Sequence, residues 1–352
     1  MSLGHGMSIG VAVLNFGEPA RPNREEVVDY LERIFYANTD IEGEMTDEEA
    51  RDRSRTLAER RAPGLIEEYE EIGGSPLRPH AERQASLLQA ELRVRGYNAT
   101  TYVGMQFTEP FIEDAVDRAH RDEIERLVAV PMYPLCGPST NVAALEELSA
   151  AVERLDWAVD VAELTGWHRH PGYTRLRADN VRSFVRTRGL SLDGDARLVC
   201  SAHGTPKHYL DAGSRYVTYV EEYCAALAAE LGVDEYVLGY QNHENRDVDW
   251  TEPSIETVIE EVDAERVVVE PVSFVHEQSE TLGELDVDLR EDAERAGLDF
   301  YRVPVPFDDA RLVAAIADLV EPFAAGFDPG YYNLRRCQCR DSPDAFCLNA
   351  PR

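Results

Sequence analysis

Lysine is almost absent from this chain: Lys207 is the only one among 352 residues. Acidic residues dominate, because 67 Asp and Glu face 35 Lys and Arg, which leaves a formal net charge of -32. Such a surface repels phosphate backbones and anionic lipids, so nucleic acid and membrane surfaces are not expected as partners. It suits a protein that must stay soluble in concentrated salt, where self-repulsion is screened. We therefore expect a halophilic setting, with a mildly acidic mesophile as the alternative.

Long apolar runs are lacking too. No stretch of about 18 apolar residues predicts a transmembrane segment. Residues 1–8 show neither the basic start nor the apolar centre of a secretory signal, so we expect a cytoplasmic protein. In that compartment the six cysteines are not expected to form disulfides.

The chain does contain a regular alternation of apolar, β-branched runs with amphipathic stretches. Continuous apolar strands separated by helices are typical of parallel sheets covered on both faces. Four runs precede residue 170 and four follow it, so we predict an α/β protein. Its two similar, doubly wound, four-stranded halves would face each other across a cleft. The runs are Ile9–Phe16, Thr100–Phe107, Leu127–Tyr133, Val159–Leu164, Leu198–Ala202, Tyr236–Tyr240, Val267–Val275 and Phe300–Val305.

The domain boundaries follow from this pattern. We predict an N-terminal α/β half over residues 8–166 and a C-terminal half over 167–327. A cysteine-containing tail over 328–352 has no helical period. Within the first half, the charged insertion 37–71 is either a flap over the cleft or solvated surface.

A histidine stands directly after one buried strand, in the segment Ser201–Pro206. Ligands of doubly wound sheets bind beyond the carboxyl ends of the strands, so His203 is placed to face the cleft. There it could accept a proton near neutral pH or bind a metal. The alternative is a core histidine bonded to a backbone carbonyl.

Acidic residues recur at Glu280, Glu284 and Asp288, four positions apart. On a helix this spacing puts three carboxylates on one face, where they could relay protons or pass on a cation. About one residue in five of this chain is acidic, however, so the spacing alone is weak support.

Aromatic and soft side chains gather at the other strand ends. They could line a flat, apolar pocket for a large planar ligand, or they could be ordinary core. These residues are Phe16, Met105, Phe107, Tyr133 and Trp250.

In their order and spacing these segments resemble the ferrochelatase family, whose members insert ferrous iron into a porphyrin. The resemblance extends from Val11 to about Leu319. The matching segments are Leu14–Pro19, Gly73–Leu77, Glu109–Val116, Ser201–His203, Gly239–Gln241 with Trp250 and Pro253, and Glu280–Asp286.

The resemblance implies roles for single residues. His203 would lie over the porphyrin centre, where it would accept pyrrole protons or contact the iron. Glu280 would be its carboxylate partner across the macrocycle. Glu284 and Asp288 would continue a line of metal-handling acids.

Two positions depart from the family pattern. Gln278 stands where the family usually has a histidine, and His276, two residues earlier, could compensate. Gln106 stands where many members carry arginine. With lysine nearly absent, the porphyrin propionates would need Arg, hydroxyl or backbone N–H partners. The predicted porphyrin-binding set is Phe16, Arg33, Ser75, Met105, Gln106, Phe107, Tyr133, Trp250 and Gln278.

The resemblance implies a haem-biosynthesis enzyme with ferrous iron and protoporphyrin IX or coproporphyrin III as substrates. Clamping the macrocycle in a puckered shape would expose its nitrogens, at a strain of about 1–5 kcal/mol. The alternatives are a chelatase for another tetrapyrrole or metal, and a non-catalytic tetrapyrrole carrier or iron–sulfur sensor.

Cys337, Cys339 and Cys347 supply three soft ligands near the end of the sequence, and Cys136 at a strand end could supply a fourth. Some ferrochelatases hold a [2Fe–2S] cluster with a similar set, so the resemblance implies a cluster here. Zinc is the alternative, because four thiolates suit it equally, and a tail with incidental thiols is another.

Overall fold

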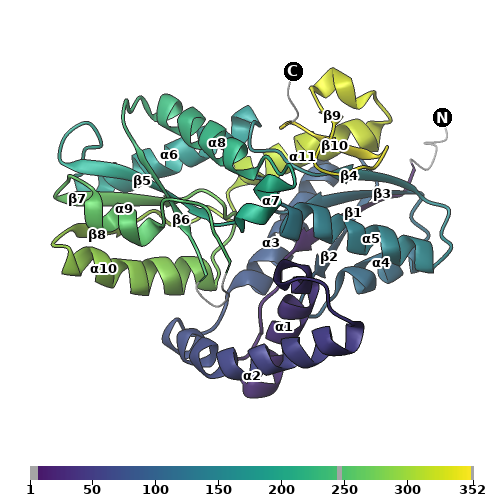
Figure 1. The fold of residues 1–352 in the computed structure, drawn as a ribbon. Helices are drawn as coiled ribbons and strands as arrows, with labels where there is room; N and C mark the ends of the chain where they lie inside the picture. The colour runs from purple at the N-terminus through teal and green to yellow at the C-terminus, as the bar shows by residue number, and fades with distance from the viewer. Residues whose placement is uncertain (1–6, 244–247, 350–352) are drawn as a thin grey trace.

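The computed structural model describes residues 7–243 and 248–349. Most of the segment 1–8, which was examined for a secretory signal, and the last three residues of the predicted tail 328–352 lie outside these ranges. Two parallel sheets lie side by side with helices on both faces (Figure 1). This arrangement confirms the predicted α/β class and its two doubly wound halves. Among the described residues, no helix is long and apolar enough to cross a membrane.

The first sheet has the strand order β2-β1-β3-β4-β10-β9. All neighbours pair in parallel except β9 and β10, which are antiparallel. Its strands are β1 (Ile9–Asn15), β2 (Ala99–Met105), β3 (Arg126–Pro131), β4 (Asp160–Leu164), β9 (Arg335–Arg336) and β10 (Ala345–Cys347).

The second sheet has the order β6-β5-β7-β8 and is parallel throughout. If the first four strands of each half are numbered along the chain, both sheets have the order second, first, third, fourth. The halves therefore share one topology. The strands are β5 (Ala196–His203), β6 (Val237–Gln241), β7 (Arg266–Pro271) and β8 (Asp299–Arg302).

The helices follow the strands as a doubly wound fold requires. The N-terminal part contains α1 (Arg24–Ala37), η1 (Thr39–Glu42), α2 (Asp47–Glu71), α3 (Leu77–Val94), α4 (Ile112–Arg121), η2 (Pro138–Val142) and α5 (Ala143–Arg154). The remainder contains α6 (Pro171–Arg188), α7 (Lys207–Asp211), α8 (Tyr216–Leu231), α9 (Ile255–Glu261), η3 (Glu280–Asp288), α10 (Leu289–Arg295), α11 (Ala310–Ala325) and η4 (Pro329–Tyr332).

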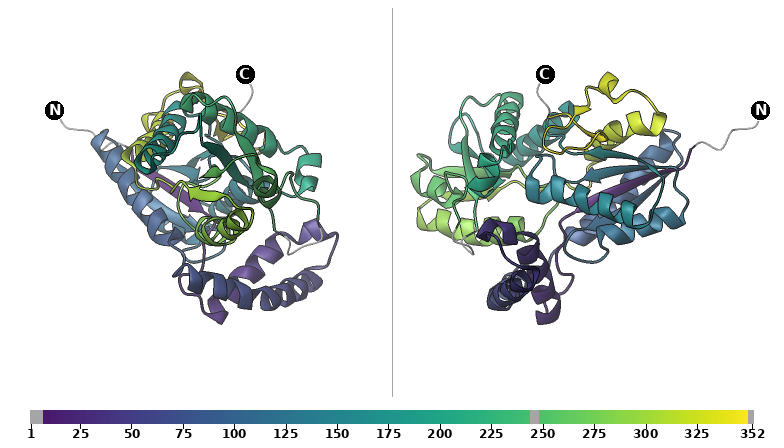
Figure 2. Two further views of the ribbon diagram at one scale, coloured as in Figure 1. Left: turned by 90° about the vertical axis from the view of Figure 1, so that its left-hand side faces the viewer. Right: turned by 45° about the vertical axis from the view of Figure 1, so that its right-hand side comes forward.

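The tail differs from its prediction as a separate appendage. Strand β10 pairs with the edge of β4, Ala345 opposite Glu163 and Phe346 opposite Leu164, so the first sheet has six strands instead of four. Burial of Ala345 and Cys347 stabilises this pairing. The yellow segment lies beside β4 in Figure 1 and in the right-hand view of Figure 2.

Helix α11 links the two halves. It packs on α3 of the first half as well as on α6 of the second. Arg95, at the end of α3, holds it with ion pairs to Asp318 at 2.7 Å and to Glu321 at 3.1 Å. Helix α11, which belongs to the predicted second half 167–327, therefore also packs on the predicted first half 8–166.

The charged insertion 37–71 contains η1 and α2, and α2 packs against the preceding helix α1 to form a helical hairpin. Figures 1 and 2 show it on one side of the molecule, beneath both sheets. Asn23 caps α1, and Thr46 with Glu49 forms a capping box at the start of α2, which fixes where each helix begins. Leu57 and Leu65 of α2 are buried against α1, while much of the opposite face is exposed.

Helices η2 and η3 are π-helical and occupy equivalent places, after β3 and β7. The acidic segment Glu280–Asp288 was expected to be an α-helix. A π-helix has a wider turn, so residues four apart still lie near one another on one face. Helices of this type are rare and occur frequently at functional sites.

Candidate active site

A cavity of about 250 Å³ lies between the halves, beyond the carboxyl ends of the strands. This is where a doubly wound sheet presents its ligand site. The sequence-predicted residues that line it are Phe16, Tyr133, His203, Trp250, Gln278, Glu280 and Glu284.

His203 is the last residue of β5, and the backbone around it is tightly held. Its N–H donates to Ser273 Oγ at 2.9 Å, and its carbonyl accepts from the Tyr216 hydroxyl at 3.0 Å. At Gly204 a Cβ would lie 2.7 Å from the Gln241 carbonyl oxygen, so glycine is required directly after the histidine.

The His203 ring is oriented by the backbone. Its Nδ1 lies 2.6 Å from the Gly204 carbonyl, which can only accept, so Nδ1 carries the proton and Nε2 presents a lone pair. Burial lowers the pKa of His203, although the bond to Gly204 opposes this. The result is a neutral imidazole with a basic nitrogen at the cavity wall.

The acids of η3 are held by Gln241 at the end of β6. Its Nε2 donates to the Glu280 carbonyl at 3.0 Å and to Glu284 Oε2 at 2.9 Å. Desolvation raises the pKa of Glu280, and desolvation with the Glu280 charge raises that of Glu284 well above its usual range. These carboxyl groups are therefore able to hold protons at higher pH than exposed ones.

Gln278 is buried and donates its amide to the Glu280 carboxylate. It cannot accept a proton as a histidine would, but it orients the acid and favours its charged form. His276 lies within hydrogen-bonding distance of Asn15 Oδ1, at 3.1 Å, and burial lowers its pKa to about 4. It therefore connects the two halves at the cavity and stays neutral at physiological pH.

Glu18 is a buried acid that sequence reasoning missed. Its carboxylate accepts from the Ser279 N–H at 3.2 Å, from the Tyr69 hydroxyl at 3.3 Å, and from the hydroxyls of Ser75 and Ser279. Desolvation first, and then the charge of Glu280, raise the pKa of Glu18 to about 7. It joins the first half to the start of η3.

The opposite wall is largely apolar and comes from the first half and its hairpin. The Phe16 ring packs against Phe107 at 4.5 Å, and Tyr30 and Tyr69 add aromatic surface. Arg61 of α2 is the only lysine or arginine among the described residues that line the cavity. It pairs with Glu68 at 2.6 Å.

Other predicted porphyrin-binding residues lie outside the cavity lining. Met105 and Phe107 are buried in the core, and Gln106 lies against Ser139 and Tyr133. Arg33 is exposed and stacks on the Phe111 ring at 4.5 Å, while Ser75 binds Glu18. Asp288 is exposed at the end of η3. The remaining two metal-handling acids, Glu280 and Glu284, do reach the cavity.

His243 is the other missed residue of note, because its Nε2 lies 3.1 Å from His203 Nε2. Desolvation, with help from the nearby His203 and Arg61, lowers its pKa to about 3. His243 could have been found from its position two residues after Gln241, at a strand end. Glu18 could have been found because it lies within the Leu14–Pro19 motif. Arg61 had no signal within its charged helix.

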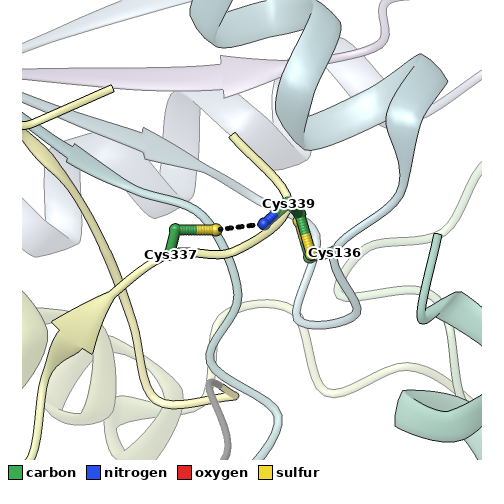
Figure 3. A group of neighbouring side chains, drawn as sticks. All are labelled: Cys136, Cys337 and Cys339. Carbon is green, nitrogen blue, oxygen red and sulfur yellow. Dashed lines mark hydrogen bonds between the residues drawn. The ribbon is translucent and has the colours of Figure 1, made fainter. Parts of the chain in front are cut away.

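The four predicted cysteine ligands come together at the edge of the first sheet. The sulfur atoms of Cys136, Cys337 and Cys339 all lie within 4.8 Å of one another (Figure 3). Cys339 N–H donates to Cys337 Sγ at 3.3 Å. Thiol hydrogen bonds from Cys136, Cys339 and Cys347 lower the pKa of Cys337 far below its usual range. Several cysteine sulfur atoms packed around one thiolate form a ligand set that suits a metal ion.

Buried polar contacts hold the tail that brings these cysteines in. Arg340 donates to Glu163 of β4 at 2.7 Å, and both side chains are almost fully buried. Asn349 donates to the Pro134 carbonyl, close in sequence to Cys136. The tail is thus fixed on both sides of Cys347.

The two-sheet architecture is similar to that of two solved SirB structures. SirB from Bacillus subtilis, solved with Fe3+, matches with a TM-score of 0.52 at 11% identity, over 91% of this chain and 97% of that one. The sirohydrochlorin chelatase SirB from B. subtilis subspecies spizizenii, in complex with cobalt, matches with a TM-score of 0.50 at 12% identity, again over 91% and 97%. At these identities the likeness shows the fold alone.

Sequence comparison defines the family. The ferrochelatase family model matches residues 8–323. A ferrochelatase of Synechococcus sp. strain RCC307 is 35% identical over 90% of this chain and 83% of its own length. One from Nostoc sp. strain PCC 7120 is 33% identical over 89% and 81%. The chain belongs to the ferrochelatase family.

Proposed function

We propose that this protein inserts Fe2+ into a porphyrin in haem biosynthesis. The observation that carries this proposal is that His203, Glu280 and Glu284 line the same cavity, together with aromatic side chains. Removing two pyrrole protons needs a base, and moving a divalent cation needs carboxylates nearby. Family membership supports both roles.

In this mechanism the porphyrin lies between the apolar wall and the wall that carries His203. His203 accepts a pyrrole proton at Nε2, because Nδ1 is committed to the Gly204 carbonyl. Gln241 holds Glu284 by its carboxylate and Glu280 by its backbone carbonyl, and the second pyrrole proton passes to one of these two carboxylates as the metal enters. Their raised pKa values let them hold protons at higher pH than exposed carboxyl groups do.

The test is an anaerobic fluorescence assay with Fe2+ and either protoporphyrin IX or coproporphyrin III. We expect quenching of one of them as metal enters. Binding of both without metallation would overturn the proposal in favour of a carrier. Metallation by Co2+ or Zn2+ but not by Fe2+ would favour a chelatase for another metal, for which Gln278 is the structural reason.

We further propose that Arg61 binds a porphyrin carboxylate, since it is the one cationic side chain among the described cavity residues. Arg61→Gln should raise KM for the porphyrin about tenfold, and more for coproporphyrin, which carries four propionates. Arg33→Gln is the matched control, because Arg33 is exposed and stacks on Phe111. An unchanged KM in Arg61→Gln would exclude this role.

We propose that Cys136, Cys337, Cys339 and Cys347 hold a [2Fe–2S] cluster. Four thiolates are the ligand set of such a cluster, and the proximity of the sulfur atoms supports it. The same set fits tetrahedral zinc. In either case the bound metal would fasten the tail to the first sheet.

Anaerobically purified protein distinguishes these alternatives. A cluster gives a coloured sample with two iron and two sulfide per chain, and Cys339→Ser should lose both. Cys224→Ser is the control, because Cys224 is buried in the core near Cys200. A colourless sample with one zinc per chain would overturn the cluster.

We also propose that the protein works in a salt-rich cytoplasm, on the strength of its net charge of -32. Turnover should fall as salt is removed, because unscreened repulsion between surface acids opposes the compact state. Turnover independent of salt would contradict this proposal.

A further inference from the structure

Two imidazole rings face each other at one wall of the cavity. His203 Nε2 and His243 Nε2 are 3.1 Å apart, and the ring planes meet at 60°. The loop after β6 carries His243, so the two rings come from neighbouring strands of the second sheet. The sequence prediction assigned no role to His243.

The distance between the two nitrogens fits a shared metal ion. With metal–nitrogen bonds of about 2.0–2.1 Å, two nitrogens 3.1 Å apart subtend an angle of about 95–100° at the metal. His203 Nε2 presents a lone pair, because its other nitrogen is bonded to the Gly204 carbonyl. Two facing lone pairs at this distance repel each other unless a proton or a cation lies between them.

The surroundings of His203 are those of a metal-binding histidine. Such a histidine directs its second ring nitrogen to a carbonyl or a carboxylate, which orients the ring. His203 meets the Gly204 carbonyl in this way, whereas His243 Nδ1 lies 3.8 Å from Glu284 Oε1, a charge contact longer than a hydrogen bond. Trp250 packs edge-on against His243 at 5.5 Å and limits its rotation.

We propose that His203 and His243 together bind the divalent metal ion before its transfer to the porphyrin; this assignment rests on the proposed function. Imidazole nitrogen selects borderline cations such as Fe2+, Co2+ and Zn2+ over Mg2+ and Ca2+. Two protein ligands leave the other coordination positions open. The metal can therefore pass to the porphyrin nitrogens, and His203 Nε2 becomes free to accept a pyrrole proton once the metal has left it.

The experiment titrates porphyrin-free protein with Co2+ by calorimetry. His243→Gln and His203→Gln are compared with wild type and with His120→Gln, whose exposed histidine lies on α4. Every titration is repeated with Cys339→Ser added, which removes binding by the cysteine site. We expect His243→Gln and His203→Gln each to weaken Co2+ binding at least about tenfold, with His120→Gln unchanged.

Insertion kinetics provide the second readout. His243→Gln should raise KM for Fe2+ about tenfold and leave KM for the porphyrin unchanged. Wild-type Co2+ affinity in His243→Gln, with KM for Fe2+ also unchanged, would overturn the proposal and leave an N–H···N hydrogen bond between the rings. Failure of the wild-type protein to metallate any porphyrin would instead refute the proposed function, whatever the calorimetry shows.

Discussion

The two halves of the molecule repeat one scaffold and differ in what they place on it. In the strand register, His203 lies opposite Gln241 as Asn15 lies opposite Met105. The same strand ends thus carry an imidazole and an amide in one half, and an amide and a thioether in the other. At these positions only the second half carries a side chain that transfers protons, His203.

The two π-helices repeat this contrast. Helix η2 has no charged residue, and Asn141 within it donates to the Tyr133 carbonyl at 2.9 Å and accepts from the Gly137 N–H at 3.1 Å. Helix η3 carries Glu280 and Glu284 into the cavity. A wide helical turn is therefore not sufficient for chemistry. Under the proposed function, the first half would position the ligand and the second half would react with it.

The strongest test of this division is at the paired strand ends. His203→Ala should lower kcat about 10²–10⁴-fold, because a positioned base is lost. Asn15→Ala should change kcat much less, although it removes the partner of His276. Stopped-flow metallation measures both. Equal losses in the two variants would contradict a division of labour between the halves.

The halves also differ in their buried ion pairs. Arg177 and Glu270 of the second half are fully buried together, and Arg177 also donates to the Phe274 carbonyl at 2.6 Å. Arg177→Ala should lower the free energy of unfolding by about 3–5 kcal/mol, because Glu270 is left unpaired. Urea unfolding measures this loss.

Arg340→Ala removes the corresponding pair with Glu163 in the first half. We expect a smaller loss of stability, because the Ser149 hydroxyl still donates to Glu163 Oε1 at 3.0 Å after Arg340 is removed. Metal content should fall as the tail loosens. A loss as large as that of Arg177→Ala, with metal content intact, would show that the tail is as integral as the core.

Glu18 makes stability depend on pH. Its pKa is about 7 in the folded protein and near 4.5 when exposed, so the folded state binds more protons between these values. Stability from this group is therefore lost as pH rises from about 4.5 to 7, on the order of 3 kcal/mol.

Glu18→Gln should flatten this slope, because glutamine resembles the protonated acid and does not ionise. Thermal melts at pH 5.5 and 8 measure it, with the exposed Glu25→Gln as control. An unaltered slope in Glu18→Gln would assign the pH dependence to other buried acids.

The smallest expected effects are at the helix caps. Asn23 caps α1 in the first half, and Ser254 caps α9 in the second, each by accepting a backbone N–H. Alanine at either position should cost about 1 kcal/mol of unfolding free energy. A loss of several kcal/mol at one cap alone, in urea titrations, would reveal unequal stability of the halves.

Much of the fold was predictable because buried parallel strands leave continuous apolar runs. The predicted run Val159–Leu164 differs from β4 by one residue, and His203 was correctly placed at a strand end in the cleft. Strand β10 was not predictable, because three residues carry no periodicity and their pairing depends on contacts with β4.

Within the site, the sequence did not predict the direction in which each side chain points. Met105 and Phe107 stand at a strand end as Phe16 does, but local register directs them into the core. Phe16 differs from them because the chain turns directly after it, at Gly17, which has a positive φ of 91°. Glu18 and His243 lie in loops, where no periodic pattern marks a buried residue.

The pairing of β10 with β4 has a consequence for biosynthesis on the ribosome. Strand β4 is complete at Leu164, but its neighbour is made only when residue 347 leaves the exit tunnel. Until then the edge of β4 presents unpaired N–H and C=O groups, and strands of other nascent chains can hydrogen-bond to them. A stop codon just before Ala345 should therefore cause aggregation during translation, even though every residue that lines the cavity has already been made.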